Sequence, residues 1–478
     1  MSQPAPFIPS RPDESPVPPA PWRVFGTRSY FRLWLAQVTS STGDWVGLIA
    51  ILAIAARVSH NSGAAVGLVM AARVIPGFLL GTVGGVIIDR FDRRRVMVTC
   101  DVGRAVLLAV LPFMESLAGL VAVSFALEIM TLLWGPAKDA SVPHLVKTEQ
   151  LPSANTLSLV ASFATFPLAS VCFSLLAALA AWLGSFDFLK SIELDQEALA
   201  LLVDALTFVV SALIVVRLPI PHDRQRRGRR VDWTGTLRDI KDGLHFIRNH
   251  PRVRGIIIGL GLALIGGGAM IPLGPVFARK ALGGDSATFG ALMAALGFGA
   301  AAGVVALLAL QRRLPKVTVF EFSIIGSGVF LFLGATATEL AFAVLAIALV
   351  GACAGTAYVT GFTVLQETVH DEVRGRTFAT MYTVVRLCLL ISLVISPLWA
   401  DFWDWVTGAV LEHRTATFSG VHYSFPGVRV ALWCGGLINI AAGFWAWWSM
   451  RRAERAEARR AEADGDPGDT GVADAGAA

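Results

Sequence analysis

The stretch GGVIIDRFDRRRVM, at residues 84–97, places two glycines and two acidic residues beside four arginines. Long apolar runs at 64–88 and 96–114 flank these charges. An apolar run of about 20 residues is long enough to cross a bilayer as a helix. The charges therefore lie where two membrane spans meet water, and the small residues allow neighbouring helices to approach closely. This arrangement predicts a membrane protein with several spans.

The composition of the whole chain supports this prediction and excludes other classes. Of 478 residues, 55% are hydrophobic and 16% are charged, and the mean hydropathy is +0.63. Soluble proteins carry about 25% charged residues, so this chain has too few charges to coat two or three soluble domains. The net charge of +5 indicates no nucleic-acid partner, because the basic residues lie mainly between apolar runs.

The sequence contains no motif for catalysis, nucleotide binding or metal binding. Its five cysteines form no Cys-x-x-Cys pair, and its eight histidines show no zinc-protease spacing. It also has no P-loop and no Gly-x-Ser-x-Gly nucleophile elbow. We therefore expect neither an enzyme nor an ATP-driven pump, and we expect no cofactor and no metal ion.

Twelve apolar segments predict an all-α integral membrane protein with twelve transmembrane helices in two six-helix bundles. The segments are 33–57, 64–88, 96–114, 119–140, 154–183, 198–217, 254–278, 286–310, 317–337, 340–364, 378–400 and 428–449. The first bundle occupies residues 31–218 and the second occupies 253–450. A proline-rich disordered tail at 1–30, a linker at 219–252 and a disordered tail at 451–478 complete the predicted organisation.

Positive charge indicates how the spans are oriented. Most Lys and Arg side chains fall in the two tails and in the loops on one side of the spans. Loops rich in Lys and Arg stay in the cytoplasm, so we expect a multi-pass plasma-membrane protein with both termini cytoplasmic. In the linker, apolar residues recur on one helical face and predict an amphipathic helix on the inner membrane surface; they are Trp233, Leu237, Ile240, Leu244 and Ile247.

The stretch at 84–97 resembles the loop 2–3 signature of the major facilitator superfamily, G-x-x-x-D-R-x-G-R-R. Asp92 stands where the signature has its second glycine. The strings CDVGRA at 100–105 and RGRTFA at 374–379 extend the likeness to macrolide-efflux and enterobactin-exporter-like proteins. The resemblance implies a cytoplasmic gating latch built from ion pairs. Its matching positions are Gly85, Asp89, Arg90, Arg93 and Arg94.

The same resemblance implies a secondary transporter, usually an exporter of an amphiphilic small molecule, such as a drug or a siderophore-like metabolite, by proton antiport. The expected partners are that small molecule, protons and membrane lipid, and the expected state is a monomer. The fifth span reads SFATFPLASVC at 162–172 and lacks the glycines that usually flank its proline in antiporters. Two alternatives stay open: an inward mover of lysophospholipid, other lipid or a nutrient, and a non-transporting scaffold or sensor.

Charged side chains inside the spans are the candidate coupling residues. Asp44 lies near the middle of the first span and Glu128 near the middle of the fourth. Such residues are costly in a bilayer and mark function by default, because a buried carboxyl group can bind a proton near neutral pH. Arg73 and Arg386 can neutralise these acids or bind an anionic substrate, and a purely structural ion pair is the equal alternative for both.

Two further groups of buried charge have structural interpretations. Asp101 and Arg104 are three residues apart, which predicts an ion pair within one helix. Asp204, in the sixth span, is also interpreted as structural.

Overall fold

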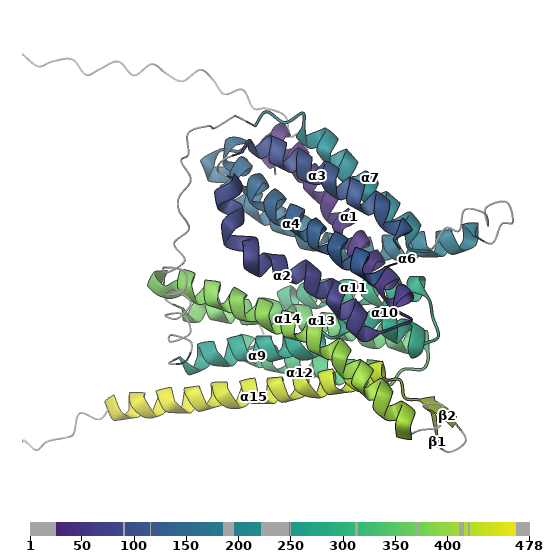
Figure 1. The fold of residues 1–478 in the computed structure, drawn as a ribbon. Helices are drawn as coiled ribbons and strands as arrows, with labels where there is room; N and C mark the ends of the chain where they lie inside the picture. Colours follow the sequence, from purple (N-terminus) through teal and green to yellow (C-terminus); the bar gives the residue numbers. More distant parts are fainter. Residues whose placement is uncertain are drawn as a thin grey trace, which may run out of the picture.

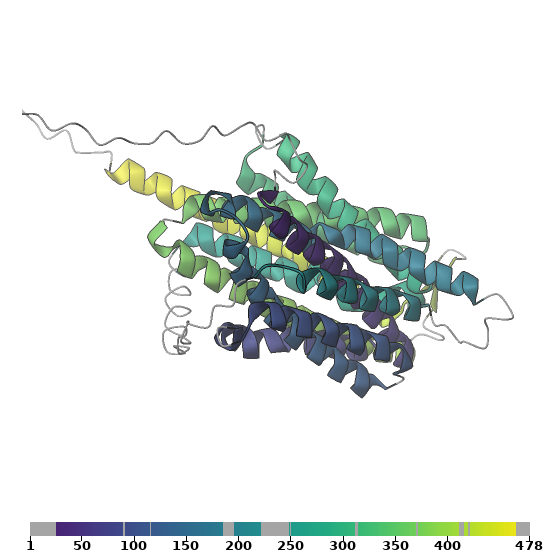
Figure 2. The ribbon, with the colours of Figure 1, turned by 90° about the horizontal axis from the view of Figure 1, so that it is seen from above.

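The computed structural model describes residues 25–88, 91–114, 116–184, 196–220, 248, 250–310, 314–369, 371–410, 415–418 and 421–464. These residues form long helices in two groups that follow the two halves of the chain (Figures 1 and 2). The predictions for most of the two tails, for the amphipathic linker helix, and for Asp89 and Arg90 lie outside the described residues.

The structure describes seven helices and three short 3₁₀ turns in the first half. They are α1 (Arg28–Val58), α2 (Gly63–Ile88), α3 (Arg93–Val110), η2 (Leu111–Phe113), α4 (Leu117–Ser141), η3 (Val142–His144), η4 (Thr148–Gln150), α5 (Leu151–Phe163), α6 (Thr165–Leu183) and α7 (Ala198–Val215). Polar residues begin three of them: Thr27, Asp92 and Ser116 each accept a hydrogen bond from a first-turn amide of α1, α3 or α4. Such caps satisfy amides that have no partner within the helix.

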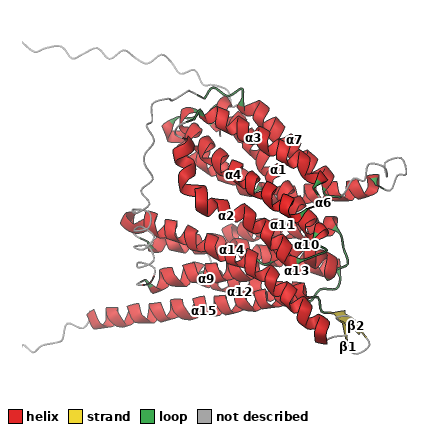
Figure 3. Ribbon diagram, viewed as in Figure 1, coloured by secondary structure: helices red, strands yellow, loops and turns green. Residues whose placement is uncertain are grey.

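In the second half, the described residues form further helices and one hairpin. They are α9 (Pro251–Gly267), α10 (Met270–Lys280), α11 (Ser286–Leu310), α12 (Lys316–Ala335), α13 (Leu340–Thr368), α14 (Asp371–Val410), β1 (Thr415–Phe418), β2 (Val421–Ser424) and α15 (Gly427–Asp464). The strands pair antiparallel, with Phe418 opposite Val421. Figure 3 shows this hairpin as an addition to an otherwise helical fold.

The twelve predicted spans each correspond to a helix or a helix pair. Eleven of the described segments are long and apolar enough to cross a membrane, and α2 supplies the twelfth. The fifth span is divided into α5 and α6, because Pro167 has no amide and its ring crowds the carbonyl of Phe163, where α5 ends. Two helices are longer than predicted: α14 runs ten residues past 400, and α15 continues to Asp464.

The helix ends lie at two surfaces. We call the surface with the start of α1 and the end of α15 the termini side, and the surface with the hairpin the far side (Figure 1). The two halves touch in the half of the spans nearest the far side. There Gly290 of α11 lies against Ser174 of α6, and Gly67 of α2 lies against the Leu393 carbonyl of α14.

The buried hydrophobic side chains form three clusters, which shows how the halves are joined. One cluster contains residues of both halves, including Ile54, Phe173 and Phe289, and it lies toward the far side. The other two each belong to one half and lie toward the termini side: one contains Tyr30 and the other contains Phe320. Among the described residues, the hydrophobic core is therefore shared on the far side and divided on the termini side.

Candidate functional site

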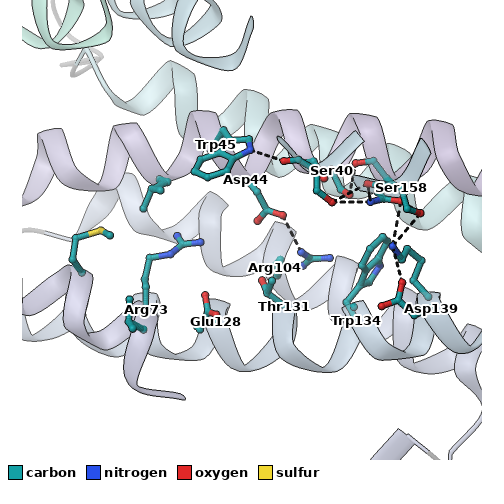
Figure 4. Close-up of a pocket in the computed structure, with 18 of the residues that line it drawn as sticks. Ser40, Asp44, Trp45, Arg73, Arg104, Glu128, Thr131, Trp134, Asp139 and Ser158 are labelled. Atoms are coloured by element: carbon teal, nitrogen blue, oxygen red, sulfur yellow. Dashed lines mark hydrogen bonds and ion pairs between the residues drawn. The ribbon is translucent and has the colours of Figure 1, made fainter. Parts of the chain in front are cut away.

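A cavity of about 740 Å³ lies within the first half of the chain. Figure 4 shows polar and charged side chains around it, together with the indole rings of Trp45 and Trp134. Apolar side chains, Leu48, Met70 and Val74, complete part of the wall. The cavity runs from the middle of the spans, at Asp44 and Glu128, toward the termini-side end of α4, so it suits a molecule that has both apolar and charged parts.

Asp44 of α1 is tied to α3 through Arg104. The Arg104 Nη1 atom lies 3.4 Å from Asp44 Oδ2, and its Nη2 atom lies 2.5 Å from Asp101 Oδ1. The guanidinium also lies over the ring of Phe208, 4.1 Å from its centre, and Ser211 donates a hydrogen bond to Asp101. The predicted Asp101–Arg104 pair is confirmed. Its link to Asp44 was missed, because no sequence spacing relates α1 to α3.

Arg73 and Glu128 face the same part of the cavity as Asp44 (Figure 4). Neither makes a hydrogen bond or an ion pair with any residue that the structure describes, although the charge of Arg73 acts on both acids. Arg386 does not line this cavity: it is an exposed residue of α14, in the second half. Three of the four predicted coupling residues therefore meet in one place.

The central group of charges is unbalanced. Asp44, Asp101 and Glu128 supply three carboxyl groups, whereas Arg73 and Arg104 supply two guanidinium groups. Asp204 of α7 lies behind Asp44, with its carboxyl oxygens against Gly43 and Gly47 of α1 and a hydrogen bond from Thr207. Because Asp204 is buried too, the region carries excess negative charge when every acid is ionised.

A second polar group lies nearer the termini side and centres on Lys138. This lysine is only 6% exposed, and its ammonium lies 2.9 Å from Asp139, 3.3 Å from Ser158 and 3.4 Å from Gln37. The sequence does carry a signal for this position, because Lys138 falls inside the fourth apolar segment, at 119–140, where a cation must find partners.

The gating signature is described in part. Gly85 lies in α2, while Asp89 and Arg90 are outside the described residues. Arg93 donates to the Ala140 carbonyl and contacts His144, each at 2.9 Å, so it joins the start of α3 to the end of α4. Arg94 reaches the Leu218 carbonyl at 3.5 Å. These contacts lie within the first half, and the gating latch itself stays a prediction.

The far side holds polar contacts between the halves that the sequence did not indicate. Asp401 of α14 accepts hydrogen bonds from Ser62, Gly63 and Ala64 at the start of α2, each at 3.0 Å. Glu197, before α7, forms ion pairs with Arg57 of α1 at 3.3 Å and with Arg279 of α10 at 3.2 Å. These contacts join the two halves on the far side.

Two groups of membrane-spanning helices, one for each half of the chain, and a polar cavity within the first of them define the class as a major facilitator superfamily transporter. A sequence profile of the transmembrane secretion effector family matches residues 19–394, and the chain belongs to this family. It is a multi-pass membrane transporter and not an enzyme.

Two relatives match most of the chain. The MFS-type transporter YkuC of Bacillus subtilis is 24% identical over 74% of this chain and 81% of its own length. Macrolide efflux protein A of Streptococcus pyogenes is 23% identical over 78% of this chain and 89% of its own. A third, the MFS-type transporter YfiS of Bacillus subtilis, is 28% identical, but the match covers 46% of this chain and 49% of YfiS.

Solved structures agree on the fold. A bacterial homologue of the lysosomal transporter Spinster, in an inward-facing and unoccupied conformation, is 16% identical and has a TM-score of 0.67 over 90% of this chain and 98% of its own. The nucleoside transporter NupG is 12% identical with a TM-score of 0.64 over 88% of this chain and 99% of its own. At these identities the likeness concerns the fold alone.

Proposed function

We propose that this transporter exports an amphiphilic small molecule in exchange for protons, through the cavity of the first half. The observation that carries the proposal is the meeting of Asp44, Glu128 and Arg73 in one cavity that also has aromatic and apolar walls. The distant likeness to macrolide efflux protein A supports export as the direction. The substrate is then a drug or a siderophore-like metabolite.

The excess negative charge provides the coupling in this proposal. A buried carboxylate without a matching cation is unfavourable in a low-dielectric interior. Either a proton or the cationic part of a substrate can remove that cost at Asp44 or Glu128. The two therefore compete for the same acids, so the carrier returns with protons after it has released the substrate.

Arg73 prevents the two acids from staying protonated throughout the transport cycle. Its guanidinium attracts both carboxylates, so it favours release of the proton once the cavity opens to water of higher pH. Arg386 belongs to the second half, and its charge also acts on Glu128. We propose that it helps Arg73 to attract the carboxylates in the state in which the halves close on the termini side. In this scheme the protein lies in the plasma membrane and its termini side faces the cytoplasm, so both ends of the chain are cytoplasmic.

The test uses inverted membrane vesicles with an acidic interior and a dye that reports the internal pH. Macrolides, lipophilic cations and siderophores are added to vesicles that contain the wild type, Asp44→Asn, Glu128→Gln or the control Glu339→Gln. Glu339 is exposed on the far side and does not line the cavity. We expect substrate-dependent proton release in the wild type and the control, and its loss in at least one cavity variant.

The alternatives give different results. Substrate uptake into right-side-out vesicles, and not into inverted ones, would establish an inward mover and contradict export. Transport that both cavity variants retain would contradict proton coupling through these acids. Folded protein that moves none of the compounds in either type of vesicle favours the scaffold or sensor.

A further inference from the structure

A second cavity, of about 850 Å³, lies in the other half of the molecule, at the termini side. Four helices form it, and each contributes residues from the end that lies near this surface: the starts of α9 and α12, the end of α13, and the part of α15 near Arg451. Figure 1 shows α9, α12 and α15 side by side. The cavity is separate from the one that contains Asp44, and none of the described residues lines both.

Among the residues that the structure describes, three cations from three helices line this second cavity. They are Arg252 of α9, Lys316 of α12 and Arg451 of α15. Two acids also line it, but both are engaged: Glu367 forms an ion pair with Lys316, and Glu321 is 4% exposed and has interaction partners of its own. Arginine carries five N–H donors, so Arg252 and Arg451 can keep their present contacts and still bind an anion.

Backbone amides add to this positive character. The α9 and α12 helices both begin here, and neither of the residues that precede them, His250 and Pro315, caps its helix with a side-chain hydrogen bond. Val317 and Thr318 belong to the first turn of α12 and line the cavity. First-turn amides point out of a helix start and favour a negative group there.

The position of the cavity relative to the membrane limits the kinds of ligand that it can bind. The spans formed by α9, α12, α13 and α15 end at Pro251, Lys316, Thr368 and Arg452 on this side. These ends define the level at which apolar side chains give way to water, which is also the level of lipid headgroups. Trp447, whose ring lies 5.0 Å from the Arg451 guanidinium, is a residue type that favours this level.

We propose that this second cavity is a binding site for a phosphate group, held by Arg252, Lys316 and Arg451 at the membrane surface. The phosphate can come from the headgroup of an anionic phospholipid or from a free phosphate compound. Guanidinium groups bind phosphate through paired hydrogen bonds, and the helix starts of α9 and α12 supply further donors. The site is independent of the proposed transport function.

Native mass spectrometry of the detergent-solubilised full chain tests the proposal. The protein is titrated with phosphatidylglycerol or with phosphatidylcholine of the same acyl chains, and separately its melting temperature is measured with and without inorganic phosphate. We expect the wild type to bind phosphatidylglycerol more tightly than phosphatidylcholine. Loss of one charged hydrogen bond in Arg451→Gln or Arg252→Gln should weaken that binding about tenfold.

The matched control is Arg452→Gln. Arg452 is the next residue of α15 and lies over Trp448 as Arg451 lies over Trp447, but it does not line the cavity. Normal binding in this variant, with loss in the other two, supports a phospholipid. Stabilisation by inorganic phosphate that Arg451→Gln and Arg252→Gln lose, without any lipid preference, supports a free phosphate compound. Equal loss in all three variants, or neither effect in the wild type, overturns the proposal.

Discussion

Asp401 of α14 caps the start of α2 at Gly63, so one half of the transporter supplies the helix cap of the other. Its two carboxyl oxygens accept from Ser62, Gly63 and Ala64, all at 3.0 Å. An ordinary cap comes from the residue before its own helix and persists in every state of the protein. This cap exists only while α2 and α14 touch on the far side, so it stabilises that state selectively.

Replacing this cap should favour opening of the far side. We expect Asp401→Ala to lower the stability of the far-side-closed state by about 1 kcal/mol. Thermal unfolding in detergent should show a lower melting temperature, and a cysteine placed at Ser62 should react faster with a water-soluble thiol reagent. The control is Asp285→Ala, which removes a cap that α11 receives from the residue directly before it. It should lower the melting temperature without raising the reactivity at position 62.

Glu197 should be essential to the same closure, because it neutralises two arginines from different halves. Glu197 is 1% exposed, and Glu197→Gln leaves Arg57 and Arg279 facing each other. The Glu197 side chain is buried, but those of Arg57 and Arg279 are 39% and 18% exposed. Its removal should therefore cost more than the roughly 1 kcal/mol of an exposed pair and less than the roughly 3 kcal/mol of a fully buried one. Chemical unfolding in detergent measures this cost. The double variant Glu197→Gln/Arg279→Gln should recover part of the loss, and simple additivity of the two single losses would contradict the coupling.

Position 67 should tolerate no side chain, whereas position 77 on the same helix should accept one. A methyl group at Gly67 would lie 2.7 Å from the Leu393 carbonyl of α14, and nothing described lies within 4 Å of one at Gly77. Gly67→Ala should therefore separate α2 from α14 and reduce transport severalfold, and Gly77→Ala should leave transport intact. Substrate uptake into vesicles, normalised to the amount of folded protein, compares the two. Equal activity would show that the close contact is not required.

Asp92 offers a test of the gating signature. It stands at the position of a signature glycine and caps α3 by accepting from the Arg95 amide at 2.8 Å. Glycine is also a good residue before a helix, so Asp92→Gly should cost only a few tenths of a kcal/mol. Asp92→Ala should cost about 1 kcal/mol. Thermal unfolding distinguishes the two, and an equal effect would mean that the aspartate does not act as a cap.

The spans and the central acids were predictable because both follow from local properties of the chain. Twenty apolar residues have few alternatives to a membrane helix, and a carboxyl group within such a run is conspicuous, as Asp44 and Glu128 are. Pairs within one helix, such as Asp101 and Arg104, follow from the helical repeat. The break between α5 and α6 follows from the chemistry of Pro167.

Contacts between helices could not be predicted in the same way. The pairing of Arg104 with Asp44, and of Asp401 with the start of α2, depends on which helices lie side by side, and no spacing along the chain encodes that. The roles assigned to Asp44, Glu128, Arg73 and Arg386 therefore stay predictions, although the structure places the first three around one cavity. The latch at Asp89 and Arg90 also stays a prediction.

The shared hydrophobic cluster on the far side determines how the transporter must move. To open that side, side chains such as Phe173 and Phe289 must separate from each other, and burying apolar surface contributes about 25 cal/mol for each Å². Opening is favourable only if the two divided clusters meet on the termini side at the same time. The free energy lost on the far side is then nearly offset by the free energy gained on the termini side. Because the two states differ by this small amount, a weakly bound substrate, or one proton, is enough to reverse which state is favoured.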